Sequence, residues 1–150
     1  MPDNADDCAR EVLDTIPLIM CAIRTEMRKR RKFDLSVPQF RALAFLHHFP
    51  NASLSDVAEH VGLMLPSMSK LMDGLVARGL VTRRESSGDR RRVDLALTPA
   101  GKSVLEMAYK ECQAHLAVVL GQLGAGERAA VIRAMQTLRT IFTATETPKL

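Results

Sequence analysis

The chain has 150 residues, a formal net charge of +4, 47% apolar residues and 25% charged residues. This length is enough for one well-buried core and short for two independent domains. The apolar share argues against a disordered chain, and the scarcity of aromatic residues favours helix over sheet. The acidic start is unlike a signal peptide, and no apolar run reaches the roughly 18 residues that cross a bilayer, so we expect a cytoplasmic protein.

The cysteines lack the pair spacing of a structural zinc site or a disulfide framework. They are Cys8, Cys21 and Cys112. We therefore expect neither kind of site and predict small buried side chains at these positions. No cofactor motif is visible, and we expect no cofactor and no metal.

Apolar residues from about Asp7 to Lys32 recur at three- and four-residue steps, which predicts an amphipathic helix. They are Val12, Ile16, Ile19, Ile23 and Met27. Pro17 either kinks this helix or marks the start of its regular part after Thr15. The basic residues 28–32 follow at the C-terminal end, where they complement the helix dipole and are lesser candidates for phosphate contact.

A capping-box pattern at residues 36–39 predicts a second helix that begins at Val37. Its predicted buried side chains are Phe40, Leu43, Ala44, Leu46 and His47. The sequence Phe49-Pro50-Asn51 should end it. Leu54 is then expected on a short strand beside a later hairpin.

The next two helices are predicted to be joined by a tight turn. Ser55 should cap the first of them, with Asp56 in its first turn, and Gly62 should close it. Its inward side chains are predicted to be Val57, Ala58 and Val61. The second should run from Pro66 to Arg78, because apolar residues recur there at helical spacing. This stripe contains Leu65, Met68, Leu71, Met72, Leu75 and Val76.

A change of period follows the second of these helices. Gly79 is a predicted left-handed cap, and from Leu80 to Leu97 apolar and polar residues alternate, as in a hairpin with its turn at residues 86–89. Residues 65–102 carry eight basic and four acidic residues, a net charge of +4, and the rest of the chain sums to zero. A positive field confined to this helix and hairpin suits phosphate binding.

Two long helices are predicted to complete the chain. Thr98 and Pro99 should start the first, residues 121–126 should break it, and a tail from Thr143 should fray. Their apolar stripes contain Val104, Leu105, Ala108, Cys112, Leu116, Val119, Leu120, Val131, Ile132, Met135, Leu138, Ile141 and Phe142. This is more apolar surface than a small core covers, so a partner surface is needed.

Several segments together resemble the MarR family of bacterial transcriptional regulators. They are the helix from Pro66 to Arg78, Arg78-Gly79-Leu80-Val81, Asp89-Arg90-Arg91 and Leu97-Thr98-Pro99-Ala100-Gly101. The family's wing pattern is an Asp, any residue, an Arg, five residues and then Leu-Thr, and this sequence meets it in full.

The resemblance implies a mainly α fold with a small β-wing. A winged helix-turn-helix, residues 35–98, would be flanked by an N-terminal dimerisation helix, residues 1–34, and C-terminal dimerisation helices, residues 99–150, as one structural unit. Such a homodimer would place two recognition helices on pseudo-palindromic half-sites about one helical turn of double-stranded DNA apart.

The winged helix-turn-helix offers a set of candidate DNA contacts. They are Ser55, Pro66, Ser67, Ser69, Lys70, Arg83, Arg84, Arg90 and Arg91. Ser67, Ser69 and Lys70 would meet base edges and phosphates in the major groove, and Arg90 and Arg91 would enter a minor groove at the wing tip. Asp89 would orient Arg91 through a charge-assisted pair, as the resemblance also implies. Arg83, Arg84 and Arg92 are expected to touch phosphates or only to shape the field.

The family resemblance also implies a small aromatic or anionic effector that releases a repressor from DNA. Candidate residues for its pocket are Met20, Arg24, Phe33, Phe40 and His47. The sequence shows no catalytic constellation, so we do not expect an enzyme.

Three alternatives remain open at this point. A redox sensor would use Cys8 or Cys21, a metal sensor would use His47, His48 and His60, and a winged helix can also serve protein contact alone.

Overall fold

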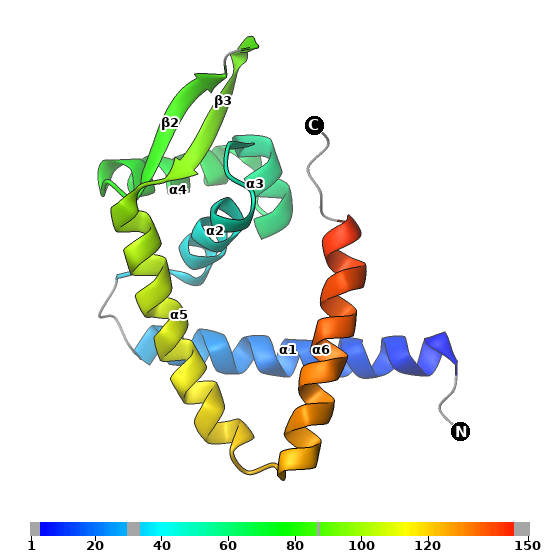
Figure 1. Cartoon of the computed structure of the whole chain (residues 1–150). Helices are drawn as coiled ribbons and strands as arrows, with labels where there is room; N and C mark the ends of the chain where they lie inside the picture. The colour runs from blue at the N-terminus through cyan, green and yellow to red at the C-terminus, as the bar shows by residue number, and fades with distance from the viewer. Residues whose placement is uncertain (1–3, 30–33, 87, 146–150) are drawn as a thin grey trace. The chain divides into compact units, whose positions relative to one another are not determined.

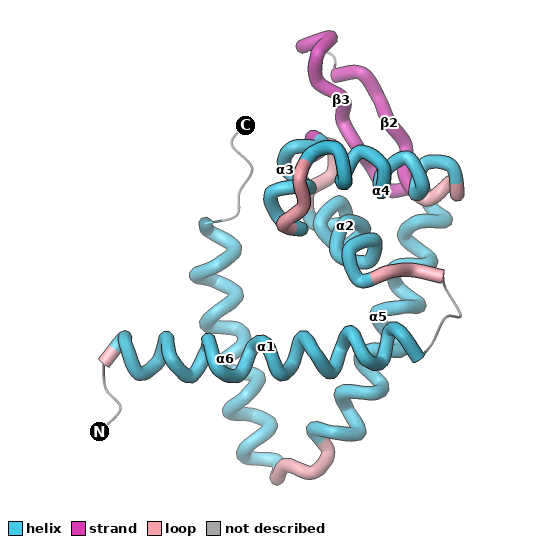
Figure 2. Tube along the Cα trace, turned by 180° about the vertical axis from the view of Figure 1, so that it is seen from behind, coloured by secondary structure: helices cyan, strands magenta, loops and turns pink. Residues whose placement is uncertain are grey.

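The computed structural model describes residues 4–29, 34–86 and 88–145. Within these ranges the predicted mainly α class with a small β-wing is confirmed (Figures 1 and 2). The elements are α1 (Ala5–Lys29), α2 (Val37–His48), β1 (Ala52–Ser53), α3 (Leu54–Val61), α4 (Leu65–Ala77), β2 (Val81–Ser86), β3 (Asp89–Leu97), α5 (Pro99–Leu120) and α6 (Ala125–Thr145). The chain forms two compact units, residues 1–37 and 38–150. The predicted three-part division stays a prediction.

Helix α1 makes up most of the described part of the first unit. It begins after Asn4, whose side-chain Oδ1 accepts a hydrogen bond from the Asp7 amide at 2.8 Å. Pro17 lies inside the helix, so a regular part that starts only after Thr15 is ruled out. Cys8 and Cys21 are exposed on α1, which contradicts their predicted burial, because helical spacing alone does not say which face is covered.

The core of the second unit lies where α2, α3 and α4 pack against the base of the hairpin (Figure 1). Its largest fully buried side chains are Leu43, Leu46, Val57, Met68, Met72, Leu75, Val81 and Leu95. Two residues that were predicted to face inward from α2 and α4 are instead exposed. His47 is exposed near the end of α2, and Leu65 is 50% exposed because it is the first residue of α4 and projects beyond the packed turns.

The start of α3 differs from the prediction by two residues. Ser53, not Ser55, is the N-cap: its hydroxyl accepts from the Asp56 amide at 3.2 Å, and Asp56 Oδ2 accepts from the Ser53 amide at 3.0 Å. This reciprocal box needs an acid three residues after the cap, and Asp56 supplies it only for Ser53. Leu54 is therefore in the helix, and the short strand ends before it.

The sheet has the strand order β1-β3-β2, with both pairs antiparallel. Its central strand, β3, pairs with β2 from Val81↔Leu97 outward, and Ser86 opposite Asp89 closes the hairpin. Strand β1 contributes only two pairs, Ala52↔Leu95 and Ser53↔Asp94. The predicted hairpin is thus confirmed, and it is joined to the helices by a very short ladder.

The structure defines where helices α5 and α6 begin and end. Thr98 caps α5 as predicted, and its hydroxyl accepts from the Gly101 amide at 2.9 Å. Helix α6 already begins at Ala125 and reaches Thr145, so the predicted break is shorter and the predicted tail starts later than expected. The exposed apolar side chains of this pair include Val118, Val119, Leu120, Val131, Ile132, Met135, Ile141 and Phe142.

Candidate nucleic-acid interface

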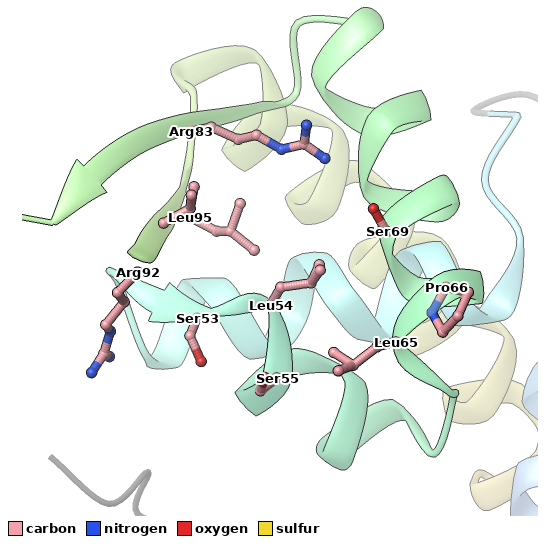
Figure 3. Close-up of a pocket in the computed structure, with 10 residues that line it drawn as sticks. Ser53, Leu54, Ser55, Leu65, Pro66, Ser69, Arg83, Arg92 and Leu95 are labelled. Carbon is pink, nitrogen blue, oxygen red and sulfur yellow. The ribbon is translucent and has the colours of Figure 1, made fainter. Parts of the chain in front are cut away.

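A hollow of about 720 Å³ lies between the start of α3, the start of α4 and the sheet (Figure 3). It is lined by Ser53, Leu54, Ser55, Leu65, Pro66, Ser69, Arg83, Arg92, Val93 and Leu95. Four predicted DNA contacts are among these residues, and they come from three separate segments of the chain. The fold therefore brings hydroxyl and guanidinium groups together on one face.

The first turn of α4 presents unused backbone donors. Met64 is its N-cap and provides no side-chain hydrogen bond, and Pro66 occupies the first turn. The amides of an uncapped first turn, at the positive end of the helix dipole, favour an anion. Ser67 and Lys70 are exposed on the same end of α4, and Ser69 is half-buried toward the hollow.

Arg83 reaches from β2 toward the helix that carries Ser69 (Figure 3). Its guanidinium donates to Asp73 of α4, so part of its charge is already offset within the protein. Arg84, the next residue on β2, is exposed. Of the two arginines, Arg84 is therefore better placed for a free phosphate contact, a distinction that the sequence does not reveal.

Arg92 lies within ion-pair distance of two carboxylates, although its buried Nε has no hydrogen-bond partner among the described residues. Its Nε lies 3.4 Å from Asp94 Oδ1, and its Nη2 lies 3.9 Å from Asp56 Oδ2. This arrangement argues against its predicted role as a phosphate contact, because two negative charges already surround one guanidinium.

At the wing tip, the backbone of Asp89, Arg90 and Arg91 begins β3. The side chains of these three residues lie outside the described part of the structure. The orienting role of Asp89 and the minor-groove role of the two arginines stay predictions.

Arg41 is a positioning residue that the sequence analysis missed. From α2, its guanidinium donates to the carbonyl oxygens of His60, at 2.9 Å, and Val61, at 3.1 Å, which end α3. A cation suits the C-terminal end of a helix dipole, and these bonds use carbonyls that have no partner within the helix. Arg41 thus fixes the last turn of α3 just before the turn that leads into α4. A lone arginine in a helix gives no sequence signal for this role.

The run from Leu97 to Gly101 joins the wing and α4 to α5. Thr98 Oγ1 donates to the Gly79 carbonyl at 2.6 Å, and the Thr98 amide donates to the Leu80 carbonyl at 3.1 Å. A Cβ on Gly101 would lie only 2.1 Å from the Leu80 carbonyl oxygen. These residues of the family pattern are therefore structural, and they tie the end of α4 to the first turn of α5.

The predicted effector residues are distributed over both units. Met20 and Arg24 lie on α1, where Arg24 Nε donates to the Met20 carbonyl at 3.3 Å, and Phe40 and His47 lie on α2. Phe33 lies outside the described residues. The effector pocket stays a prediction.

The described residues also bear on two other kinds of site. No group of three or more His, Cys, Asp or Glu side chains there is arranged to hold a metal ion. Among the same residues, no helix combines the length and the apolarity needed to span a membrane.

A sequence model of the MarR family matches residues 33–92. The chain is 33% identical over 107 residues, 71% of its length, to YfiV of Bacillus subtilis (strain 168), an uncharacterized HTH-type transcriptional regulator, and this match covers 67% of YfiV. The chain belongs to the MarR family. It is therefore a DNA-binding transcriptional regulator and not an enzyme.

Solved structures of the family agree with this fold. A MarR-family regulator from Silicibacter pomeroyi matches 81% of the chain and 82% of its own, with 26% identity and a TM-score of 0.64. The transcriptional repressor CouR, bound to a 23-mer DNA duplex, matches 85% of the chain and 94% of its own, with 25% identity and a TM-score of 0.67. The winged helix-turn-helix predicted from the sequence is thus confirmed.

Proposed function

We propose that the protein is a homodimeric repressor that binds a pseudo-palindromic DNA operator and is released by a small aromatic or anionic effector. It would act in the bacterial cytoplasm, where the chromosome is. The repressor role draws support from the similarity to CouR, a repressor with DNA bound. The release by an effector rests on the family resemblance.

The observation that carries the proposal is the convergence of Ser55, Ser69 and Arg83 on one hollow. Ser55 comes from α3, Ser69 from α4 and Arg83 from the wing, so a ligand in this position touches all parts of a winged helix-turn-helix at once. Base edges and phosphates offer the acceptors that such hydroxyl and guanidinium groups need.

Within this site we assign the residues different tasks. The exposed Ser67 and Lys70 and the half-buried Ser69 face the major groove from the first turns of α4, where a recognition helix meets base edges. Because Pro66 has no backbone N–H, its position in that turn adds no amide donor that competes with the side chains for DNA acceptors. Arg84 meets phosphate, and Arg90 and Arg91 reach a minor groove whose negative potential rises where it narrows over A·T-rich DNA.

The dimer is supported by the apolar side chains that the described chain leaves in water. Val118 on α5 is 76% exposed, and Ile132 and Phe142 on α6 are 56% and 57% exposed. A second copy that covers these helices buries apolar surface and sets the spacing of the two recognition helices. An effector controls DNA binding only if it binds more tightly at one spacing of the recognition helices than at another. Because the same helices set this spacing, an effector that binds them can control DNA binding.

A cysteine-based sensor is the second candidate function. Cys8 and Cys21 are exposed, so both thiols are accessible in the described chain. A reactive thiol also needs a positive neighbourhood that stabilises the thiolate. Measurement of DNA binding before and after treatment with peroxide, with Cys8→Ser and Cys21→Ser alongside, distinguishes this candidate from a small-molecule regulator.

The main test is selection of bound duplexes from a random-sequence library at two salt concentrations. We expect a palindromic consensus with A·T-rich flanks. Arg91→Ala should keep the central half-sites and lose the preference at the flanks, and Arg128→Ala, on α6 outside the site, is the matched control. Weak binding without sequence preference and with a steep salt dependence would instead favour a winged helix used for protein contact, with only an electrostatic patch for DNA.

A further inference from the structure

Arg92 lies on β3 between the wing tip and the two residues that pair with β1, and it reaches the start of α3. Its Nε is 3.4 Å from Asp94 Oδ1 on its own strand, and its Nη2 is 3.9 Å from Asp56 Oδ2 on α3. The Arg92 side chain is 37% exposed and both carboxylate side chains are 23% exposed. These charges are therefore partly shielded from water, in contrast to ordinary surface pairs.

Asp56 has a second task at the same point. Its Oδ2 also accepts a hydrogen bond from the Ser53 amide at 3.0 Å, which completes the capping box of α3. Ser53 is in turn paired with Asp94 in the β1–β3 ladder. One carboxylate thus links the cap of α3, the short strand β1 and the guanidinium of β3.

The ladder that Arg92 reinforces is very short. Strand β1 has only two residues, and its pairs with β3 are Ala52↔Leu95 and Ser53↔Asp94. A single additional backbone bond, from the Asn51 amide to the Leu95 carbonyl at 3.1 Å, extends it. The buried side chains of Val81 and Leu95 hold the hairpin near its start, and the pairing of β3 with β1 ends at Asp94, before the wing tip. A small rotation of β3 beyond Asp94 therefore moves the tip.

We propose that Arg92 is a positioning residue that fixes the wing to the first turn of α3 through Asp56. It sets the direction in which the β2–β3 hairpin leaves the helix-turn-helix, and therefore where Asp89, Arg90 and Arg91 meet DNA. The inference rests on the proposed DNA contact of the wing. Arg92 thus acts within the protein to position the wing, whereas Arg84, exposed on the neighbouring strand, contacts phosphate.

The charges of the two partners allow a sharp test. Asp56→Asn makes the protein more positive but retains an oxygen that can accept from the Ser53 amide, so the cap of α3 is preserved. If Arg92 positions the wing through Asp56, both Asp56→Asn and Arg92→Gln should bind the selected duplex roughly fivefold more weakly than wild type. The double variant should show no further loss. The salt dependence should stay unchanged in both, whereas Arg84→Gln, the matched control, should lower its slope by about one.

A second measurement uses the free protein and needs no DNA. Exchange of the Asn51 amide with deuterium, followed by NMR, reports opening of the β1–β3 connection. We expect faster exchange in Asp56→Asn and Arg92→Gln and unchanged exchange in Arg84→Gln. If wild-type protein binds no duplex, the proposed function fails, and this exchange still decides whether Arg92 braces the wing.

The proposal is overturned if Asp56→Asn binds duplex as tightly as wild type or more tightly. It is equally overturned if Arg92→Gln lowers the salt slope by about one, because Arg92 is then a phosphate contact. Unchanged exchange of the Asn51 amide in both variants also refutes it, since the connection between β1 and β3 is then independent of this ion pair.

Discussion

Large apolar side chains are mostly buried in the winged helix-turn-helix and mostly exposed on the terminal helices. From α2 to β3, large side chains such as Leu43, Met72 and Leu75 are fully buried within one chain. On α6, side chains with the same character, such as Ile132 and Phe142, remain more than half exposed. Helical periodicity is present in both regions, so periodicity indicates a face that needs cover and does not say whether the cover comes from the same chain.

The difference predicts that the stability of the fold and the self-association of the chain depend on different regions. The winged region has its own core, caps and connections, and its folding should depend little on a partner. The terminal helices leave apolar surface exposed, and a second copy covers it in the proposed dimer, so their contribution should depend on protein concentration. Matched pairs of variants test this dependence.

Leu75→Ala should destabilise the winged region by about 2–5 kcal/mol, because it removes a fully buried side chain and leaves a cavity. Leu120→Ala is the matched substitution on the exposed stripe and should cost less than about 1 kcal/mol in dilute protein. Denaturant unfolding at low protein concentration measures both. Equal costs would contradict the idea that only the winged region has a core of its own.

Gly101→Ala should cost about 1–3 kcal/mol, because its Cβ would stand 2.1 Å from the Leu80 carbonyl oxygen. Gly126→Ala, near the start of α6, meets open space and should be neutral or slightly stabilising. Thermal unfolding compares the two variants. A harmless Gly101→Ala would show that the junction between Leu80 and α5 is loose.

Ile132→Asp should weaken self-association roughly tenfold, because a charge replaces an apolar side chain in the proposed dimer surface. Gln136→Asp, one turn further along α6, adds the same charge at an exposed polar position and should have a smaller effect. Sedimentation over a range of concentrations gives both dissociation constants. An unchanged value for Ile132→Asp would place the partner surface elsewhere.

Ser53→Ala should cost about 1 kcal/mol through loss of the N-cap of α3, and Ser55→Ala should change stability by less than about 0.5 kcal/mol. In DNA binding the order should reverse, since Ser55 is the proposed contact. Unfolding and duplex binding on the same two variants check this. A larger stability loss for Ser55→Ala would restore the original assignment of the cap.

Much of the fold could be predicted because its information is local. The helix that begins at Val37, the left-handed Gly62 and Gly79, and the Thr98 cap follow from side-chain spacing and backbone preferences within a few residues. The candidate DNA contacts were named from their residue types and their places in the family pattern, and they stay predictions. Ser55, Ser69 and Arg83 were thus named from sequence, but only folding places all three at one hollow.

Partners distant in sequence could not be predicted. Arg41 with the end of α3, Arg83 with Asp73, and Arg92 with Asp56 join residues on different elements, and nothing in a linear pattern pairs one arginine with one acid. Even the local cap of α3 was placed wrongly. Ser53 and Ser55 are both suitable caps, and the choice depends on Asp56 and on the pairing of Ser53 with Asp94 in the sheet.

Short-range periodicity and residue type were enough to predict most of the elements, the family pattern and the segment that carries the positive charge. They could not show which arginines are offset by carboxylates, as Arg83 and Arg92 are, or which apolar faces the chain covers for itself. Those outcomes depend on which residues meet in space, and the packing of α2, α3, α4 and the sheet fixes that.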